Sequence, residues 1–324
     1  MTMKITLPST NLQVSVASSL EEVRRLCLRQ ALAETVNAVP LSMLNRQLEE
    51  NAPPNDLRAL ASRGIRGELV FPVPCLLENN PRLLGYYRLL MGYSQKEIYN
   101  KGQLGRFSAL EDKGLIPARV ATEISDLCRA FCARASELLG GIGIDRVTAP
   151  LLDELALLTL GPQLRGSINT KIGKAANKDV FTLIEKAVGH AVKTRAEARL
   201  ELENASGRKV VIAFSADPDI SIVEFVSKKE SRKIVAIEIK GGEDQSNIWN
   251  RLGEAEKSHQ SAKARGFVEF WTIYNVKTLD PTKAREKSPT THRFYSLQEL
   301  KDVNSAAFKD FRDRIISSVG IRAG

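Results

Sequence analysis

The second half of the chain combines several short strand patterns with one long helical pattern, and this order restricts the fold more than any other feature. Runs rich in β-branched and apolar residues cover 209–214, 220–226 and 233–240, and a fourth run covers 267–274. Residues 247–265 have helical periodicity and separate the third run from the fourth. The order predicts an α/β core in which a hairpin is followed by a crossover helix.

Weaker patterns lie on both sides of this core. They predict a helix over 179–200, a short strand over 292–295 and helices over 297–301 and 306–319. The fold class expected is therefore α/β, with a mixed sheet flanked by helices.

The first half has helical periodicity instead. Residues 20–36 and 118–139 place apolar side chains mostly three and four positions apart, with charged residues between them. The sequence therefore predicts a mainly helical N-terminal region at 1–160 and an α/β domain at 161–324.

Residues 83–114 contain two short helical patterns separated by a turn. A helix-turn-helix motif has this layout and places its second helix in the major groove of DNA. The second pattern, at 105–112, carries one basic residue, Arg106, and ends on Glu111 and Asp112. A packed helical subdomain is therefore an equally good interpretation.

Positive charge is concentrated in the second half. The chain carries 47 Lys and Arg against 38 Asp and Glu, a net charge of +9. Residues 1–160 hold 18 basic and 17 acidic residues, so +8 of the excess belongs to 161–324. Such an excess is typical of a surface that binds a polyanion, although a solvated basic face without a partner has the same composition.

Composition excludes several classes of protein. A hydrophobic content of 43% argues against global disorder. No apolar run approaches the roughly 18 residues of a membrane span, and the N-terminus lacks the apolar segment of a signal peptide. The 4 cysteines are too few for a disulfide scaffold, and we interpret them as small core residues. The expectation is a cytoplasmic protein without membrane association.

Three charged side chains interrupt the apolar strands of the second half. Asp219 opens the second strand directly after Pro218, and Glu238 and Lys240 lie two positions apart in the third strand. Because side chains alternate along a strand, Glu238 and Lys240 share a face, and Asp219 can approach them from the neighbouring strand.

Two adjacent carboxylates beside a lysine favour a hard divalent cation. Mg²⁺ bound by one or two carboxylates completes its shell with water and phosphate oxygens. A lysine on the same face can orient a water molecule or offset charge on a phosphate. The pattern predicts phosphodiester hydrolysis, and a cross-strand ion pair on a solvated sheet face is the alternative.

The pair Pro218-Asp219 followed by Glu238-Ile239-Lys240 resembles the PD-(D/E)xK nuclease motif. Residues 237–266 are similar to type II restriction endonucleases of the XcyI group, and BsoBI- and AvaI-like enzymes share a strand that ends in acid-x-lysine-glycine-glycine. The resemblance implies a restriction-endonuclease-like core and Mg²⁺-dependent cleavage of double-stranded DNA at a short palindrome, which is CCCGGG for XcyI-type enzymes. It also implies a homodimer and a cognate DNA methyltransferase of the same restriction-modification system, as a functional rather than a physical partner.

The resemblance implies roles for the motif residues. Asp219, Glu238 and the backbone carbonyl of Ile239 would bind the metal, and Lys240 would position the attacking water. BsoBI-like enzymes have a histidine in the helix after this strand, where this chain reads NIWNR.

Two further titratable residues and several polar residues are left with open roles. His259 either packs or contacts phosphate, and Glu185 either adds a carboxylate or lies on a solvated face. The basic segment 161–177 either contacts the DNA backbone or links two domains. The candidate DNA contacts are Arg165, Lys171, Lys174, Asn247 and Arg251.

The leading prediction is a type II restriction endonuclease with one active site in each subunit of a homodimer. The N-terminal region would serve DNA recognition, dimerisation or both, and 161–324 would be the catalytic domain. The alternatives are a repair or junction-resolving nuclease with the same core, and a DNA-binding regulator that uses 83–114 as its reader. The recognition sequence, the cleavage stagger and the number of metal ions are not predicted by these patterns.

Overall fold

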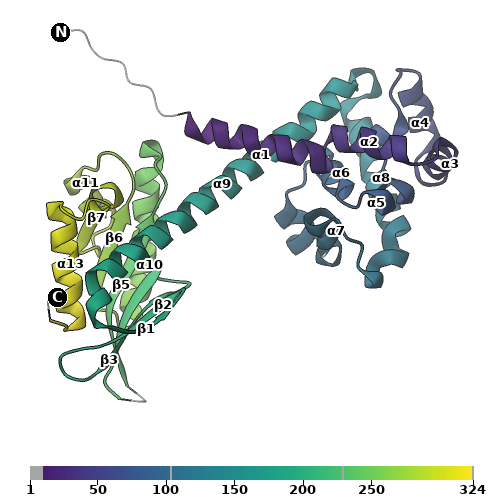
Figure 1. Ribbon diagram of the computed structural model, residues 1–324. Coiled ribbons are helices and arrows are strands. Elements are labelled where there is room, and N and C mark those ends of the chain that lie inside the picture. The colour runs from purple at the N-terminus through teal and green to yellow at the C-terminus, as the bar shows by residue number, and fades with distance from the viewer. Residues whose placement is uncertain (1–9, 103, 228–229, 323–324) are drawn as a thin grey trace, which may run out of the picture. The chain divides into compact units, whose positions relative to one another are not determined.

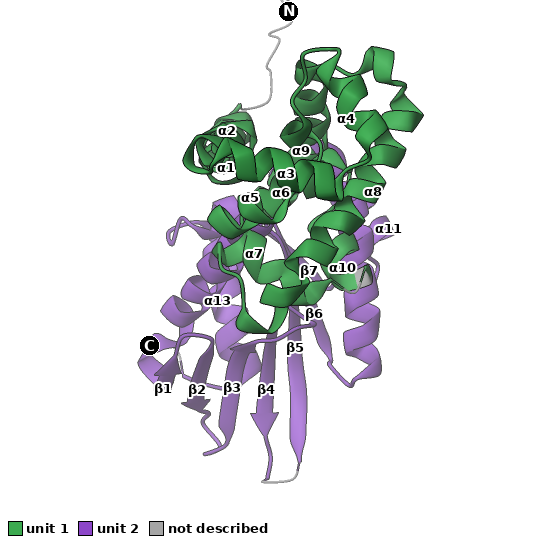
Figure 2. Cartoon of the chain, turned by 90° about the vertical axis from the view of Figure 1, so that its right-hand side faces the viewer, with its two compact units in different colours: residues 1–168 green, residues 169–324 purple. Residues whose placement is uncertain are grey.

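The chain forms two compact units, which divide between Ile168 and Asn169 (Figure 2). The computed structural model describes residues 10–102, 104–227 and 230–322 (Figure 1). The larger hydrophobic cluster of each unit consists of residues of that unit alone, so each unit has a core of its own.

The described part of unit 1 is helical, as the periodicity of the first half predicts. Its main helices are α1 (Asn11–Cys27), α2 (Arg29–Ala38), α3 (Leu41–Asn51), α4 (Pro54–Ala61), α5 (Pro74–Asn79), α6 (Leu83–Leu90), α7 (Ser108–Lys113), α8 (Ile124–Ile142) and the first part of α9 (Ala149–Val188). The helical pattern over residues 20–36 is confirmed, and it is divided between α1 and α2 because Leu28 has an extended backbone.

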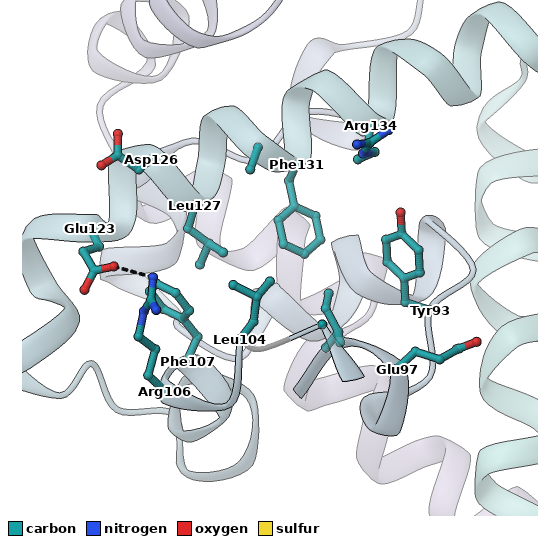
Figure 3. A pocket seen from close by; sticks show the side chains of 13 residues that line it. Tyr93, Glu97, Leu104, Arg106, Phe107, Glu123, Asp126, Leu127, Phe131 and Arg134 are labelled. Atoms are coloured by element: carbon teal, nitrogen blue, oxygen red, sulfur yellow. Dashed lines mark ion pairs between the residues drawn. The ribbon is translucent and has the colours of Figure 1, made fainter. Parts of the chain in front are cut away.

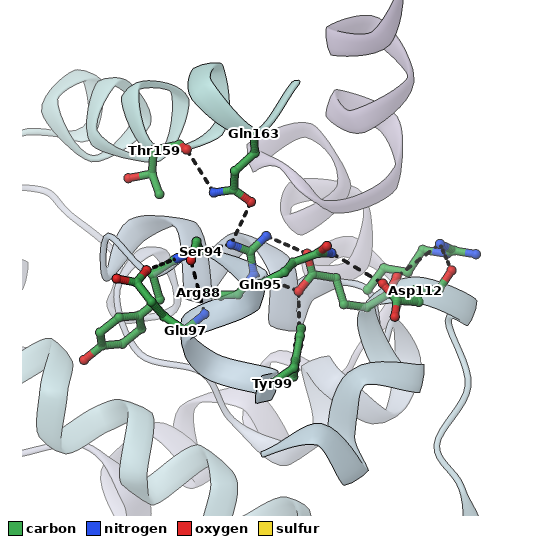
Figure 4. A network of polar contacts seen from close by, with 11 residues as sticks. Arg88, Ser94, Gln95, Glu97, Tyr99, Asp112, Thr159 and Gln163 are labelled. Atoms are coloured by element: carbon green, nitrogen blue, oxygen red, sulfur yellow. Dashed lines mark hydrogen bonds and ion pairs between the residues drawn. The ribbon is translucent and has the colours of Figure 1, made fainter. Parts of the chain in front are cut away.

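The segment that resembles a helix-turn-helix motif is packed around a buried ion pair (Figure 4). Arg88 of α6 pairs with Glu111 of α7 at 2.6 Å, and their side chains are 2% and 9% exposed. The hydroxyl of Tyr99 and the amide of Gln95 also donate to Glu111, at 2.7 and 3.0 Å. The side of α7 that carries Glu111 is therefore packed against the rest of the subdomain.

Next to this network, unit 1 contains a hollow of about 690 Å³ (Figure 3). Leu104, Phe107, Leu127 and Phe131 supply its apolar lining. An ion pair of 2.8 Å between Arg106 and Glu123 lies at its rim, so the one basic residue of the proposed reading helix is already paired.

Unit 2 contains a seven-stranded mixed sheet whose spatial order follows the sequence. The strands are β1 (Val192–Ala196), β2 (Arg199–Glu203), β3 (Lys209–Phe214), β4 (Ile220–Phe225), β5 (Ser231–Lys240), β6 (Glu269–Tyr274) and β7 (Arg293–Ser296). Strands β1 to β5 are antiparallel to their neighbours, and β6 and β7 continue the sheet in parallel. The prediction of a mixed sheet with a crossover helix is confirmed.

Helices cover β5 on both faces. The end of α9 and helix α13 (Ala306–Val319) pack against Ile237 and Ile239. The crossover helix α10 (Ile248–Ala264) packs on the opposite face, where its Ala262 contacts the cluster around Ala236. Helices α11 (Pro281–Lys287) and α12 (Leu297–Leu300) complete unit 2. Glu238 and Lys240 lie on the same face of β5 as Ala236, because side chains alternate along a strand.

One prediction around α9 is wrong. The helix expected over 179–200 ends at Val188, and the remaining residues form the hairpin of β1 and β2. Leu200 and Leu202 are the buried alternate residues of β2, but β1 contains no buried residue, so the alternation was visible in one strand only. The segment 161–177 lies inside the 40-residue helix α9 and contains the boundary between the two units, as the alternative of a link between domains predicts.

Within the described ranges, no helix combines the length and the apolar composition that a bilayer crossing requires.

We predict that Glu111→Gln destabilises the protein by about 3–5 kcal/mol, because it leaves the buried Arg88 without its anion. The shift of the urea unfolding midpoint measures this effect. Glu50→Gln is the control, since Glu50 and its partner Arg46 are 60% and 67% exposed and such pairs contribute little. Equal stability of the wild type and Glu111→Gln would contradict the prediction.

The same carboxylate predicts an acid limb in the stability profile. Burial alone would raise the pKa of Glu111, but hydrogen bonds from Arg88, Tyr99 and Gln95 outweigh it and hold the pKa below its usual value. Glu111 therefore contributes stability above the unfolded-state pKa of about 4.3, and this contribution is lost as the pH falls through the lower folded pKa. Unfolding free energies measured between about pH 6 and pH 3 should show a smaller loss in Glu111→Gln than in the wild type.

Candidate active site

The junction of β4 and β5 brings the three predicted charged residues together. Opposite residues in this antiparallel pair include Ile220 and Ile237, and one further step in the same register places Asp219 opposite Glu238. Asp219 is fixed there by the backbone of β5, because its Oδ2 accepts the N–H of Ile239 at 2.7 Å. The two carboxylates are therefore cross-strand neighbours.

Pro218 explains why the ladder stops at this point. Continuing the register of Ile220 with Ile237 would place Pro218 opposite Ile239. Proline has no N–H to donate, so the Ile239 carbonyl cannot be satisfied by a ladder bond from this residue. In a strand, the N–H and C=O of one residue point to the same side. The Ile239 carbonyl therefore faces the side on which Asp219 binds the Ile239 N–H.

Lys240 and Glu238 form an ion pair of 3.0 Å at the end of β5. Their side chains are 15% and 5% exposed. Burial raises the pKa of Glu238, the charge of Lys240 opposes this shift, and the charge of Asp219 adds to it.

The oxygen set at this strand end fits a hard divalent cation. Asp219 and Glu238 supply carboxylates, and Ile239 supplies a carbonyl on the same side. Magnesium is typically bound by one or two protein carboxylates, with water and phosphate completing its shell. Among the described residues, no group of three or more His, Cys, Asp and Glu side chains is placed to hold a metal.

Asn177 is a residue of this site that sequence reasoning missed. It extends from α9 and donates from its Nδ2 to Oδ1 of Asp219 at 3.3 Å. Only a weak feature distinguishes Asn177 from its neighbours in α9. It is half-buried and directly follows the buried Ala176, whereas the other polar residues of this part of the helix are mostly exposed. The Asn177 amide and the Ile239 N–H therefore each hold one carboxylate oxygen of Asp219.

The two glycines that follow Lys240 pack against different helices. A Cβ atom at Gly241 would overlap the Cβ of Ala176 and lie 3.4 Å from the carbonyl oxygen of Ile172, both on α9. A Cβ atom at Gly242 would lie 2.5 Å from Cζ of Arg251, on α10. Consecutive residues thus contact the helices on opposite faces of the sheet, as strand alternation requires.

The two residues with open roles each have a partner outside the carboxylate pair. His259 is fully buried, and its Nε2 lies 2.9 Å from the hydroxyl oxygen of Thr272. Burial lowers the pKa of His259 to about 4, so the ring is neutral at pH 7. Glu185 forms an ion pair of 2.8 Å with Arg195. His259 is therefore a packed residue, and Glu185 is not a third carboxylate of the site.

Asp217 anchors the loop in front of β4. Its Oδ2 accepts from Nη2 of Arg265 at 2.9 Å and from the Ser261 hydroxyl at 3.2 Å. Arg265 and Ser261 lie at the end of α10. Asp217 therefore connects the loop that carries Asp219 to the crossover helix.

The candidate DNA contacts are distributed over two helices. Lys171 and Lys174 are exposed on α9 in unit 2, whereas Arg165 is exposed on the part of α9 that belongs to unit 1. Asn247 occupies the N-cap position of α10. Of the five, Arg251 is the one that the structure places in contact with the strand end, through Gly242.

Comparison with known proteins gives matches over nearly the whole chain. A family model described as XcyI restriction endonuclease matches residues 17–322. The type II restriction enzyme Cfr9I of Citrobacter freundii is 49% identical over 326 residues, which cover 100% of this chain and 99% of that protein. The type II restriction enzyme XcyI of Xanthomonas campestris pv. cyanopsidis is 48% identical over 323 residues, which cover 99% of this chain and 97% of that protein.

We predict that Gly241→Ala destabilises unit 2, because the new methyl group collides with Ala176. Ala176→Gly alone should cost about 1 kcal/mol through helix propensity. The double variant should be more stable than the sum of the two single effects by about 0.5–3 kcal/mol, because Ala176→Gly removes the methyl group with which Gly241→Ala would collide. Thermal unfolding of the four proteins measures this coupling, and purely additive effects would contradict the packing described.

Proposed function

Because the chain belongs to the XcyI restriction endonuclease family, it is a type II site-specific deoxyribonuclease that acts on double-stranded DNA, and we propose that Asp219, Glu238 and Lys240 are its catalytic residues. The observation that carries the proposal is the hydrogen bond from Ile239 to Asp219, which unites the two parts of the motif from separate strands. With this assignment, unit 2 contains a PD-(D/E)xK core.

Asp219 and Glu238 would hold a divalent cation, together with the Ile239 carbonyl, and we propose Mg²⁺. When bound, such a cation supplies charge that stabilises the transition state of phosphodiester hydrolysis. The hydrogen bonds from Ile239 and Asn177 orient Asp219 before any ligand arrives. A carboxylate that is already in place loses little conformational entropy on binding.

Lys240 would position the attacking water. Its Nζ donates to Glu238 on the same face of β5, so its amine already lies beside the carboxylate pair. An ammonium group there can donate to a water molecule and stabilise its hydroxide form. The hydrophobic residues on the other face of β5 hold the strand that carries both side chains.

Symmetric cleavage of a palindrome would require two copies of this site. We therefore propose a homodimer. From the resemblance to XcyI-type enzymes, we further propose CCCGGG as the recognition sequence and a DNA methyltransferase as the functional partner. Residues 1–160 would serve recognition, dimerisation or both, and 161–324 would be catalytic. Arg165, Lys171, Lys174, Asn247 and Arg251 would contact the DNA. Both relatives are type II restriction enzymes, and neither name supports a junction-resolving nuclease or a regulator.

We predict that Lys240→Ala lowers the cleavage rate of plasmid DNA by at least about 10²–10³-fold, because the transition state loses a positioned cation. DNA affinity, measured by fluorescence anisotropy, should change little. Lys257→Ala removes an exposed lysine of α10 and is the control. A Lys240→Ala protein that cleaves at the wild-type rate would overturn the assignment.

Cleavage should stop when a chelator removes divalent cations and should resume when Mg²⁺ is restored. Asp219→Asn should raise the Mg²⁺ concentration required for half-maximal cleavage, because one anionic ligand is lost. A titration of Mg²⁺ against cleavage rate measures both effects. Undiminished cleavage in chelator would exclude the metal site.

A further inference from the structure

Arg251 lies against the backbone of Gly242, two positions beyond the proposed catalytic lysine. A Cβ atom at Gly242 would lie 2.5 Å from Cζ of Arg251 and 2.6 Å from its Nη2, so any other residue at this position would displace the guanidinium. Glycine therefore allows a close approach here that no other residue allows. The result is a half-buried guanidinium beside the end of β5.

Within the described ranges, no carboxylate forms an ion pair with Arg251, whereas Lys240 pairs with Glu238 and Arg265 pairs with Asp217. Asp244 is the nearby acid: the side-chain hydrogen bond from Ser246 mainly lowers its pKa, and the charge of Arg251 contributes less. A half-buried arginine without a bound anion is costly, since guanidinium donors need acceptors.

We propose that Arg251 binds a phosphate of the DNA backbone next to the scissile phosphate, and that Gly242 admits its guanidinium to that position. The proposal rests on the nuclease function proposed above and assigns to Arg251 a specific role in it. Guanidinium is suited to this role because its planar fork donates two parallel hydrogen bonds to phosphate oxygens. The contact would fix the DNA strand beside the carboxylates without reading its sequence.

Gly242 provides an unusually direct test, because it allows Arg251 to be displaced without being removed. Gly242→Ala should be tolerated by the fold, since the overlapping atoms belong to the end of a flexible side chain. Arg251→Ala removes the guanidinium, and Arg251→Lys keeps the charge but loses the fork. Arg312→Ala is the control, because it removes one exposed positive charge from α13, on the other face of the sheet.

Binding is measured in the Lys240→Ala background with Mg²⁺, on a duplex that contains CCCGGG, over a series of salt concentrations. Arg251→Ala should weaken binding about tenfold and reduce the slope of log affinity against log salt by about one, because one phosphate contact is lost. Gly242→Ala should weaken binding in the same direction, and Arg251→Lys should restore it only in part. The double variant Gly242→Ala/Arg251→Ala should bind no more weakly than Arg251→Ala alone.

An Arg251→Ala protein with wild-type affinity and an unchanged salt slope would overturn the proposal, and so would additive effects of the two substitutions. Failure of the nuclease function is a different result. In that case the protein with Lys240 and Arg251 intact would itself leave CCCGGG-containing plasmid uncut in Mg²⁺. Thermal unfolding of Gly242→Ala shows whether this variant retains the fold. The Arg251→Ala variant tests the proposal even if Gly242→Ala does not fold.

Discussion

The hydrogen bond from the Ile239 N–H to the Asp219 carboxylate is the contact on which the site depends. It forms where the β4–β5 ladder ends: the Pro218 carbonyl accepts the Ser215 hydroxyl, and the Asp219 carboxylate takes its place as the acceptor of the Ile239 N–H. The register of the two strands places Asp219 opposite Glu238, and Pro218 leaves the Ile239 carbonyl without a ladder donor. Strand register and one proline thus bring three potential metal ligands together.

The rest of unit 2 holds this strand end from both faces. Gly241 allows α9 to approach closely enough for Asn177 to reach Asp219, and Gly242 allows Arg251 of α10 to approach from the opposite face. Glycine is therefore required at the two adjacent positions for different physical reasons. Gly241 accommodates α9, whose Ala176 methyl group cannot move away, and Gly242 accommodates the flexible side chain of Arg251. Substitutions at the two positions should accordingly differ in how they affect stability.

The parts of the structure that depend on local patterns could be predicted, and those that depend on tertiary contact could not. Strands β3 to β6 have dense β-branched runs, and their order determines the core. The β1–β2 hairpin was missed because β1 buries none of its residues, so its sequence gives no apolar alternation. Asn177 was missed for another reason: its role exists only because α9 passes the end of β5. Motif spacing along one strand contains no information about a helix that precedes it.

The charge excess acquires a more specific meaning once ion pairs are taken into account. Many cations of unit 2 are neutralised locally, as in the pairs of Arg195 with Glu185 and of Arg265 with Asp217. By contrast, α9 carries four basic residues and no acidic residue between Leu155 and Lys178. Counterion release depends on such uncompensated charge rather than on the net charge of a domain. A basic stretch on one helix that ends beside Asn177 is therefore a stronger argument for DNA contact than the total of +9.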